Sequence, residues 1–377
     1  MLTASDDNTA RLWDSAGKPL AELKGHKSSV VSASFSRDGK RILTASDDNT
    51  ARLWDSAGKQ IAELKGHTDN VSSASFSPDG KRILTASLDK TARLWDSAGK
   101  QLAELKGHTD YLTSASFSPD GKRILTASLD KTARLWDSAG KQLAELKGHT
   151  DNVTSASFSP DGKRILTASL DKTARLWDSA GKQLAELKGH TDYLTSASFS
   201  PDGKRILTAS LDKTARLWDS SGKQLAQLKW PSGSVNSASF SPDGKRILTV
   251  SSDNTARLWD ISGKQIAEKE DRDDYSDEKY DKRYGKRIFA ALSDSAPVWD
   301  RAGKQLAELK GDTSGVNTAS FSPDGKRILT ASNDRTVRLW DSAGKQLAEL
   351  KGHTDNVNIS SFSPDGKRIL TASSDNT

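Results

Sequence analysis

A histidine, a threonine and an aspartate recur together along this chain, and these residue types can carry out acid–base chemistry. In one stretch they are His149, Thr167 and Asp171. A hydroxyl beside an imidazole that a carboxylate orients could act as a nucleophile with its general base. However, the set recurs through most of the chain, whereas a catalytic centre is a single constellation. The recurrence therefore favours a structural role, and no catalytic residue is predicted.

Cofactor and metal chemistry also finds little support. The chain has 6 histidines, and each lies in a different repeat, so we expect them to be too far apart to share a metal ion. Cysteine is absent, which excludes disulfides and thiolate metal sites. The Ser-Ala-Gly-Lys turns lack the flanking glycine and following helix of a phosphate-binding loop. No cofactor or metal is predicted.

Charge and hydropathy exclude further classes. The net charge of +6 comes from a small excess in each repeat, since residues 133–173 hold six Lys or Arg against five Asp or Glu. Both signs are interspersed, so no nucleic-acid partner is expected. No apolar run approaches the ~20 residues of a membrane span, and residues 1–9 do not resemble a signal peptide. We expect a soluble, cytoplasmic protein without membrane contact, unless a leader has been removed.

The recurring polar residues lie within a sequence repeat that is marked by the dipeptide Trp-Asp. The dipeptide recurs at a constant interval, and only the step from Trp259 to Trp299 is one position shorter than the others. This gives nine units, whose tryptophans are Trp13, Trp54, Trp95, Trp136, Trp177, Trp218, Trp259, Trp299 and Trp340.

Each unit contains four short segments between turn residues, which predicts four strands. In one copy they are residues 142–147, 152–159, 163–169 and 173–178. Pro160-Asp161-Gly162 between the second and third segments fits a tight hairpin, because proline presets φ and glycine accepts a positive φ. A four-stranded sheet cannot bury both faces alone, so the sheets are expected to stack in a ring.

Six Gly-His dipeptides precede Trp-Asp dipeptides in this pattern, at Gly25-His26, Gly66-His67, Gly107-His108, Gly148-His149, Gly189-His190 and Gly352-His353. The chain therefore resembles the WD-repeat β-propeller family over essentially its whole length. The near-identity of the copies is similar to recently amplified or designed repeats. The resemblance and the unit count together predict one all-β domain over residues 1–377. That domain would be a single closed propeller of nine four-stranded antiparallel blades.

The resemblance also implies that histidine, threonine, aspartate and tryptophan form one hydrogen-bonded set in each regular unit. The complete sets are His26, Thr44, Asp48 and Trp54; His67, Thr85, Asp89 and Trp95; His108, Thr126, Asp130 and Trp136; His149, Thr167, Asp171 and Trp177; His190, Thr208, Asp212 and Trp218; and, joining the two ends of the chain, His353, Thr371, Asp375 and Trp13.

The copies differ mainly at two turns, which lie on one face in the family. One precedes the innermost strand and carries Tyr111 or Tyr193 in two units. The other precedes the tryptophan strand and carries Leu88, Leu129, Leu170 and Leu211. Together they predict an apolar, aromatic patch of the kind that binds protein partners. The alternative is sequence drift, with leucine packing locally on tyrosine.

One unit departs strongly from the others. Residues 269–284 read KEDRDDYSDEKYDKRY in place of the Gly-His turn and the innermost strand. Just before this unit, Trp230 stands where a Gly-His turn is expected. Trp230, Tyr275 and Tyr280 are therefore added to the candidate binding face. The alternative is a decayed repeat that its neighbours tolerate.

The two ends of the chain compete for one strand position, since Met1–Thr9 repeats Ile369–Thr377 almost exactly in sequence. We expect strands from both ends to build the closing blade. The C-terminal copy should fill the contested position, and the N-terminal copy should be displaced or used in a contact between molecules. A monomer is favoured, although near-identical units would also permit a strand-swapped oligomer.

The function that best agrees with these sequence features is a non-catalytic scaffold that binds a protein or peptide on the face with the variable turns. The alternatives are a structural or designed repeat without a ligand and, remotely, an enzyme with a site at the mouth of the channel.

Overall fold

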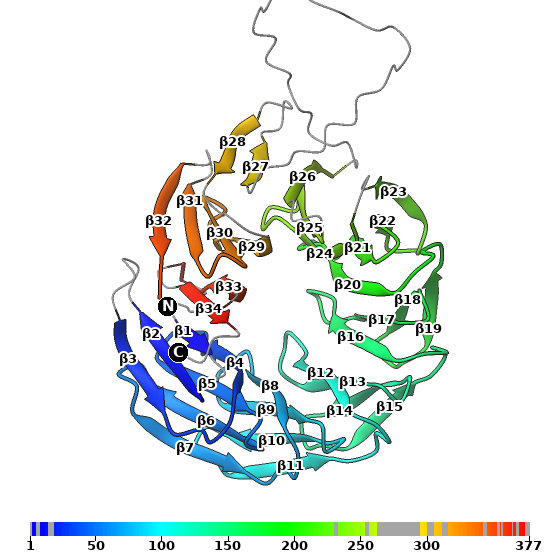
Figure 1. Cartoon of the computed structure of the whole chain (residues 1–377). Helices are drawn as coiled ribbons and strands as arrows, with labels where there is room; N and C mark the ends of the chain where they lie inside the picture. Colours follow the sequence, from blue (N-terminus) through cyan, green and yellow to red (C-terminus); the bar gives the residue numbers. More distant parts are fainter. Residues whose placement is uncertain are drawn as a thin grey trace, which may run out of the picture.

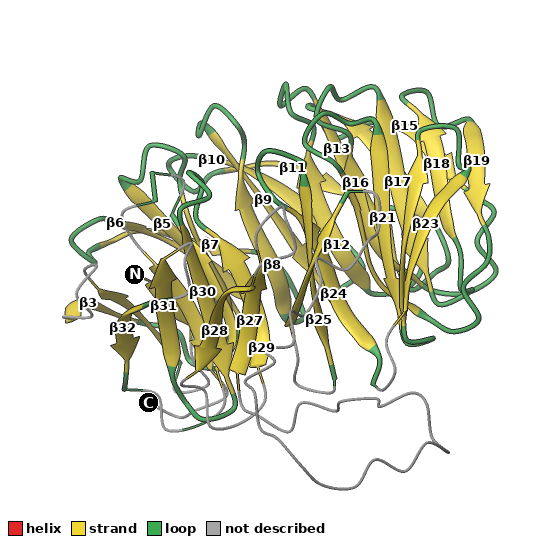
Figure 2. Cartoon of the chain, turned by 90° about the horizontal axis from the view of Figure 1, so that it is seen from above, coloured by secondary structure: helices red, strands yellow, loops and turns green. Residues whose placement is uncertain are grey.

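The computed structural model describes residues 2–4, 8–13, 19–229, 233–252, 256–261, 295–299, 305–310, 316–341, 345–352, 355, 357–363, 365–366 and 369–373. Over these residues the chain consists of strands and turns, with no helix. Figure 1 shows the sheets set side by side around a common centre, in a propeller-like arrangement. Figure 2 shows them from above, with the turns at the two ends of the strands.

Six of the sheets have four strands each, and their spatial order follows the chain. The six sheets are β4 (Val30–Phe35), β5 (Arg41–Ser46), β6 (Thr50–Asp55) and β7 (Gln60–Lys65); β8 (Val71–Phe76), β9 (Arg82–Ser87), β10 (Ala92–Asp96) and β11 (Gln101–Leu105); β12 (Leu112–Phe117), β13 (Arg123–Ser128), β14 (Ala133–Asp137) and β15 (Gln142–Leu146); β16 (Val153–Phe158), β17 (Arg164–Ser169), β18 (Ala174–Asp178) and β19 (Gln183–Leu187); β20 (Leu194–Phe199), β21 (Arg205–Ser210), β22 (Thr214–Asp219) and β23 (Gln224–Lys229); and β29 (Val316–Phe321), β30 (Arg327–Ser332), β31 (Val337–Asp341) and β32 (Gln346–Leu350).

The other three sheets of the described chain have two, three or five strands. They are β24 (Val235–Phe240), β25 (Arg246–Ser251) and β26 (Ala256–Asp260); β27 (Ser295–Trp299) and β28 (Gln305–Lys310); and β33 (Val357–Phe362), β34 (Ile369–Ser373), β1 (Leu2–Ala4), β2 (Thr9–Trp13) and β3 (Pro19–Lys24). The predicted closed ring of nine four-stranded blades is therefore wrong, because six of the sheets formed by the described residues have four strands.

The divergent unit accounts for part of this difference. Its sequence places charges at the innermost strand position, and burying them between sheets would be costly. In the structure, β25 contacts β29, so the sheets on either side of this unit are direct neighbours. Residues 269–284, with Tyr275 and Tyr280, lie outside the described residues, as does Trp230.

The sheet that joins the two ends also differs from expectation. Its order is β3-β2-β1-β34-β33, so both copies of the repeated segment lie within it. β1 pairs with β2 in the register of a regular blade, with Leu2 opposite Leu12, and pairs in parallel with β34, with Leu2 opposite Leu370. The expected displacement of the N-terminal copy is therefore wrong. Because the two copies have nearly the same sequence, each can pair with its neighbouring strand as in a regular blade: β1 with β2 and β34 with β33. The two copies also pair with each other.

The local sequence explains the strands. In β9, Ile83 to Ser87 are all buried, as expected for a strand covered on both faces. The hairpin before β9 is fixed by Asp79, whose Oδ1 accepts hydrogen bonds from Ser77 Oγ at 2.6 Å and from the Lys81 amide at 3.0 Å. Gly80 adopts a φ of 69°, which a residue with a side chain rarely accepts.

The core lies between adjacent sheets. Trp95 is 1 % exposed and packs, together with Val71 and Ile83, against Leu43 and Leu53 of the preceding sheet. A buried tryptophan of this size contributes about 4–6 kcal/mol of apolar burial before entropy is counted. The same type of cluster recurs between further sheets, so each blade is stabilised by its neighbours.

An arginine adds a polar link between adjacent sheets. Arg41 Nη2 donates a hydrogen bond to the Gly80 carbonyl at 2.6 Å, and its guanidinium lies 5.4 Å from the centre of the Phe76 ring. This geometry combines a charge-assisted hydrogen bond with a cation–π contact. It recurs with Arg82 on Phe117 and Gly121, Arg123 on Phe158 and Gly162, and Arg164 on Phe199 and Gly203.

Candidate functional site

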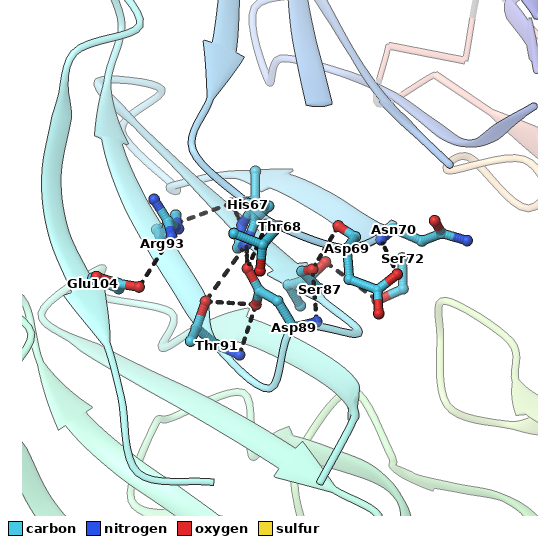
Figure 3. A network of polar contacts seen from close by, with 12 residues as sticks. His67, Thr68, Asp69, Asn70, Ser72, Ser87, Asp89, Thr91, Arg93 and Glu104 are labelled. Atoms are coloured by element: carbon cyan, nitrogen blue, oxygen red, sulfur yellow. Dashed lines mark hydrogen bonds and ion pairs between the residues drawn. The ribbon is translucent and has the colours of Figure 1, made fainter. Parts of the chain in front are cut away.

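The recurring polar set forms a continuous chain of hydrogen bonds, here called the relay. In the sheet β8–β11, Trp95 Nε1 donates to Thr85 Oγ1 at 2.9 Å, and Thr85 Oγ1 lies 2.8 Å from His67 Nε2. His67 Nδ1 lies 2.7 Å from Asp89 Oδ2. Figure 3 shows His67 and Asp89 within this network. The relay joins the tryptophan strand, β9 and the turn that carries the histidine.

One arrangement of hydrogens pairs every polar atom of the relay. If Nδ1 of His67 carries the hydrogen and donates to Asp89, then Nε2 accepts from the Thr85 hydroxyl, which in turn accepts from Trp95.

Asp89 also fixes the turn before β10. Its Oδ1 accepts from the Thr91 amide at 2.9 Å and from Thr91 Oγ1 at 2.7 Å, while its Oδ2 accepts from the Thr68 amide at 3.1 Å. Between them, Lys90 has a φ of 69°, in the left-handed region. The Asp89 carboxylate therefore links the turn that contains Thr68 to the turn that contains Lys90 and Thr91.

The glycine of the Gly-His dipeptide is required by an arginine. A Cβ added at Gly66 would collide with the guanidinium of Arg93. Arg93 is held there by Gln101, whose Oε1 lies 2.8 Å from Nη1. Glu104 also holds it, with Oε1 at 3.0 Å from Nη2, and Figure 3 shows Arg93 and Glu104. Glycine therefore leaves room for a nearly buried guanidinium beside the relay.

The relay recurs with closely similar geometry in five sheets. The histidine–aspartate distances range from 2.7 to 2.9 Å, and the tryptophan–threonine distances from 2.9 to 3.0 Å. Of the sixth predicted set, His353, Asp375 and the Trp13 side chain lie outside the described residues, while Thr371 is buried.

The relay shifts the pKa values of its members. Burial lowers the pKa of His26 and of His190, which favours the neutral imidazole. Burial opposes ionisation of Asp48, but hydrogen bonds from Thr50, the Lys27 amide and His26 outweigh it and lower its pKa to about 2. The pKa of the equivalent Asp89 is lowered for the same reason.

One departure from the relay escaped the sequence analysis. Asp312 stands at a histidine position in one unit, and there Arg338 Nη1 donates to Asp334 Oδ2 at 2.7 Å. In a histidine-containing unit, the equivalent Arg52 Nη2 stays 4.0 Å from Asp48. The arginine thus supplies a donor to the carboxylate that an imidazole serves elsewhere. The missing histidine was the signal that could have indicated this exchange.

The relay has no group available for substrate. Thr85 and Thr126 have 0 % exposure, and their hydroxyls already bond to tryptophan and histidine. A nucleophile has to reach a reacting atom. The hydroxyls of these threonines are therefore engaged in contacts within their own blades.

The two variable turns adjoin on one face. The Leu129 amide donates to the Tyr111 carbonyl at 3.0 Å, and the Leu211 amide to the Tyr193 carbonyl at 2.9 Å. Leu88 and Leu170 make the same bond to Asn70 and Asn152. Tyr111 and Tyr193 are each 42 % exposed, whereas the four leucines are half-buried. We call the surface formed by these eight residues the variable face.

The tyrosine units also differ in how they link to the next sheet. Thr113 Oγ1 donates to the Val153 carbonyl of the following sheet at 2.8 Å, and Thr195 Oγ1 does so to Val235 at 2.7 Å. In an asparagine unit, Thr154 Oγ1 donates instead within its own sheet, to Ala168. The tyrosines therefore mark every second blade in this part of the ring.

A set of exposed apolar residues on the outermost strands was not predicted from the sequence. They stand at the second position of these strands and are about half exposed: Leu20, Ile61, Leu102, Leu143, Leu184, Leu225 and Leu347. Because the outermost strand has one open face, its alternation of Leu, Glu and Lys could have indicated them.

Comparison with known families identifies this architecture. The WD40 family (WD domain, G-beta repeat) matches residues 17–55, 58–96, 99–137, 140–178, 181–219, 222–260, 303–341 and 344–377. The chain belongs to the WD40 family. The matched WD40 repeats leave out residues 261–302, which contain the divergent segment.

The chain also matches a curated protein over a short stretch. The chain is 51% identical over 41 residues to "Ribosome assembly protein 4" of Chaetomium thermophilum. The match covers 11% of this chain and 8% of that protein, which is about one repeat.

Two kinds of feature are absent from the residues that the structure describes. No helix long and apolar enough to span a membrane occurs in that part of the chain. Within the same ranges, no three His, Asp or Glu side chains gather where they could hold a metal ion.

Proposed function

We propose that this WD40 protein is a non-catalytic scaffold that binds a protein or peptide partner on the variable face. The observation that carries the proposal is the exposure of Tyr111 and Tyr193, at 42 % each. Tyrosine combines a large apolar ring with a polar tip and is enriched where proteins bind one another.

The fold itself does not require these tyrosines. Asn70 and Asn152 occupy the same position in otherwise near-identical units, and their carbonyls accept the same backbone hydrogen bond. A residue that can be exchanged without altering the turn is free to serve recognition. The half-buried leucines beside it, such as Leu129, would extend the apolar contact area.

The relay supports a scaffold rather than an enzyme because its reactive groups are buried and satisfied by one another. The similarity to the Chaetomium protein supports the presence of the repeat but does not indicate a partner. Its printed name concerns ribosome assembly, and the shared 41 residues correspond to a single repeat. The partner of the present chain therefore has to be sought experimentally.

The test is site-specific photocrosslinking in lysate of the source organism. A benzophenone amino acid is placed at Tyr111 or Tyr193 and, as matched controls, at Leu102 or Leu184 on the outermost strands. The controls are similarly exposed, at 49% and 50%. We expect a discrete crosslinked protein from the tyrosine positions that the control positions do not give.

Either contrary outcome is informative. Crosslinks from the control positions alone would move the binding surface to the outer strands. An absence of specific crosslinks at all four positions would support the alternative of a structural repeat without a ligand.

A further inference from the structure

The charged residues of a regular unit divide unequally between the two ends of its strands. In the sheet β12–β15, the turns after β12 and β14 lie at the end opposite the variable face, and Figure 2 shows the turns at both ends. This end carries three basic and two acidic residues, namely Lys122, Arg123, Lys141, Asp120 and Asp137. The unit 107–147 holds six basic and five acidic residues in total. Its excess of one positive charge therefore lies at this end.

The two carboxylates at this end are turned towards their own backbone. Asp120 Oδ1 accepts hydrogen bonds from Ser118 Oγ at 2.6 Å and from the Lys122 amide at 3.0 Å. Asp137 Oδ1 accepts from the Lys141 amide at 2.9 Å. The side chains of Lys122 and Lys141 take no part in these bonds, and both residues are exposed. Their ammonium groups therefore remain available to an anionic ligand.

Exposed lysines recur at this end of successive sheets. In β8–β11, β12–β15 and β16–β19 they are Lys81, Lys100, Lys122, Lys141, Lys163 and Lys182, and we call the surface that they form the lysine face. None of the six forms an ion pair with a carboxylate in the described part of the chain. At the opposite end, Lys106 and Lys147 each pair with a glutamate at 3.0 Å. The net positive charge of the repeats therefore lies on one face of the ring.

An arginine holds neighbouring turns of the lysine face together. Arg123 Nη2 donates to the Gly162 carbonyl at 2.6 Å, and its Nη1 donates to the Ser179 carbonyl at 3.0 Å. Gly162 and Ser179 belong to the two turns of the next sheet that also carry Lys163 and Lys182. The lysines of adjacent sheets are therefore presented by turns that are linked to one another.

Exposed leucines border the lysine face. Each follows a lysine of the second turn by two residues, so it lies about 7 Å further along the outermost strand. These leucines are Leu102, Leu143 and Leu184, which are 49 %, 51 % and 50 % exposed. The exposed tyrosines, Tyr111 and Tyr193, lie at the opposite end. Among the described residues, the lysine face therefore combines cations with aliphatic side chains and has no exposed aromatic ring.

This combination fits a lipid surface better than a nucleic acid. Proteins that bind single-stranded nucleic acids stack the bases on aromatic rings, which are exposed only at the other end of the described strands. Lysines beside aliphatic side chains are typical of segments that bind anionic membranes, where the apolar groups reach about 5–10 Å into the headgroup region. The spacing between the lysine turns and the leucines lies within that depth.

We propose that the lysine face docks on membranes that contain anionic phospholipids. Several turns at one end of a ring contact a flat surface together, and each lysine near such a surface strengthens binding about fivefold. In this orientation the variable face points away from the membrane and is free to bind a protein partner. Membrane contact is not predicted from the sequence, because the order of charges along the chain does not show that one end of the ring collects their excess.

The first test is cosedimentation of the full chain with vesicles of phosphatidylcholine, either alone or with about one-third phosphatidylserine. We expect binding to the anionic vesicles only, and weaker binding as salt is added. K81Q/K122Q/K163Q should bind them at least about tenfold more weakly, because three lysines are lost from the contact. A full chain that binds duplex RNA of random sequence but no anionic vesicles would overturn the proposal in favour of a nucleic acid.

The matched control is K90Q/K131Q/K172Q. These exposed lysines lie in the same three sheets but in turns at the opposite end, so the change in net charge is identical. A strand of six residues spans about 20 Å, which exceeds the Debye length of about 10 Å at moderate salt. The control should therefore bind anionic vesicles within about twofold of the full chain. An equal loss in both variants would show that only the total charge matters and would refute docking by the lysine face.

The second test reports which end of the ring meets the membrane. Because the protein has no cysteine, a single environment-sensitive dye can be attached to L143C, beside the lysine face, or to Y111C, on the variable face. Both native residues are exposed, at 51 % and 42 %. Anionic vesicles should shift the dye emission at L143C to shorter wavelengths and leave the emission at Y111C unchanged. A shift at Y111C alone would place the variable face against the membrane and overturn the proposal.

Discussion

Replacing Thr167 with valine removes a single hydroxyl from a buried relay while nearly preserving the shape of the side chain. Thr167 is 1 % exposed. Its Oγ1 accepts from Trp177 Nε1 at 3.0 Å and lies 2.8 Å from His149 Nε2. In the valine variant, the indole N–H and the imidazole nitrogen would both remain buried without a partner.

The size of the effect follows from these two groups. Leaving one buried donor or acceptor unpaired costs about 1–3 kcal/mol, so T167V should lose about 2–6 kcal/mol of unfolding free energy. A buried threonine that only filled space would show a much smaller change. H149A should act in the same direction and should leave binding at distant blades unchanged.

The assay is urea unfolding followed by tryptophan fluorescence, with hydrogen exchange to locate the loss. Exchange should accelerate in β17 and β18, whose unit differs in sequence from its two neighbours at Asn152 and Val153. T150V is the matched control, because Thr150 is exposed on the same blade. If T167V unfolds at the same urea concentration as T150V, the relay does not stabilise the blade.

Three further changes test other parts of the structure. K90G should stabilise by about 1 kcal/mol, because Lys90 has a φ of 69° that glycine accepts without strain; unchanged urea unfolding would contradict this. R338Q should cost about 3–5 kcal/mol, because the carboxylate 2.7 Å from Arg338 would lose a buried cation, whereas R134Q in a histidine-containing unit should cost less. Stability should fall below pH 6.5, since burial lowers the pKa of His26 and the unfolded chain then binds more protons. It should fall again from pH 3.8 towards about 2 as Asp48 is protonated, and a flat profile in melts across the acid range would refute the assignment.

The repeat made much of the fold predictable. The Trp-Asp spacing identified the family, and the turn residues around Pro160 and Gly162 marked where the strands begin and end. In five sheets, the relay consists of residues that the family resemblance named. Most of the sixth set lies outside the described residues. These features are local, because each is fixed by a few neighbouring residues that the sequence shows directly.

The errors concern contacts between distant segments. Counting units predicted nine blades, but a count does not show that Arg246 stacks on Phe321. Sequence identity at the two ends could not show that β1 would pair with β34. The exchange of partners at Arg338 depends on side-chain reach, which spacing alone does not give. In each case, the sequence offers several similar contact partners, and the structure determines which of them form the contact.

The uniformity of the arginine–phenylalanine link has a consequence for how the chain folds. The sheets that form this link offer nearly the same docking surface. Their sequences therefore do little to specify which sheet should follow which. Arg246 already contacts Phe321, one unit further along the chain than in the other pairs. During refolding, sheets that skip or exchange a neighbour would make almost the same contacts as correctly ordered ones. Folding should therefore slow through long-lived misordered states, and synthesis from one end of the chain would favour the correct order.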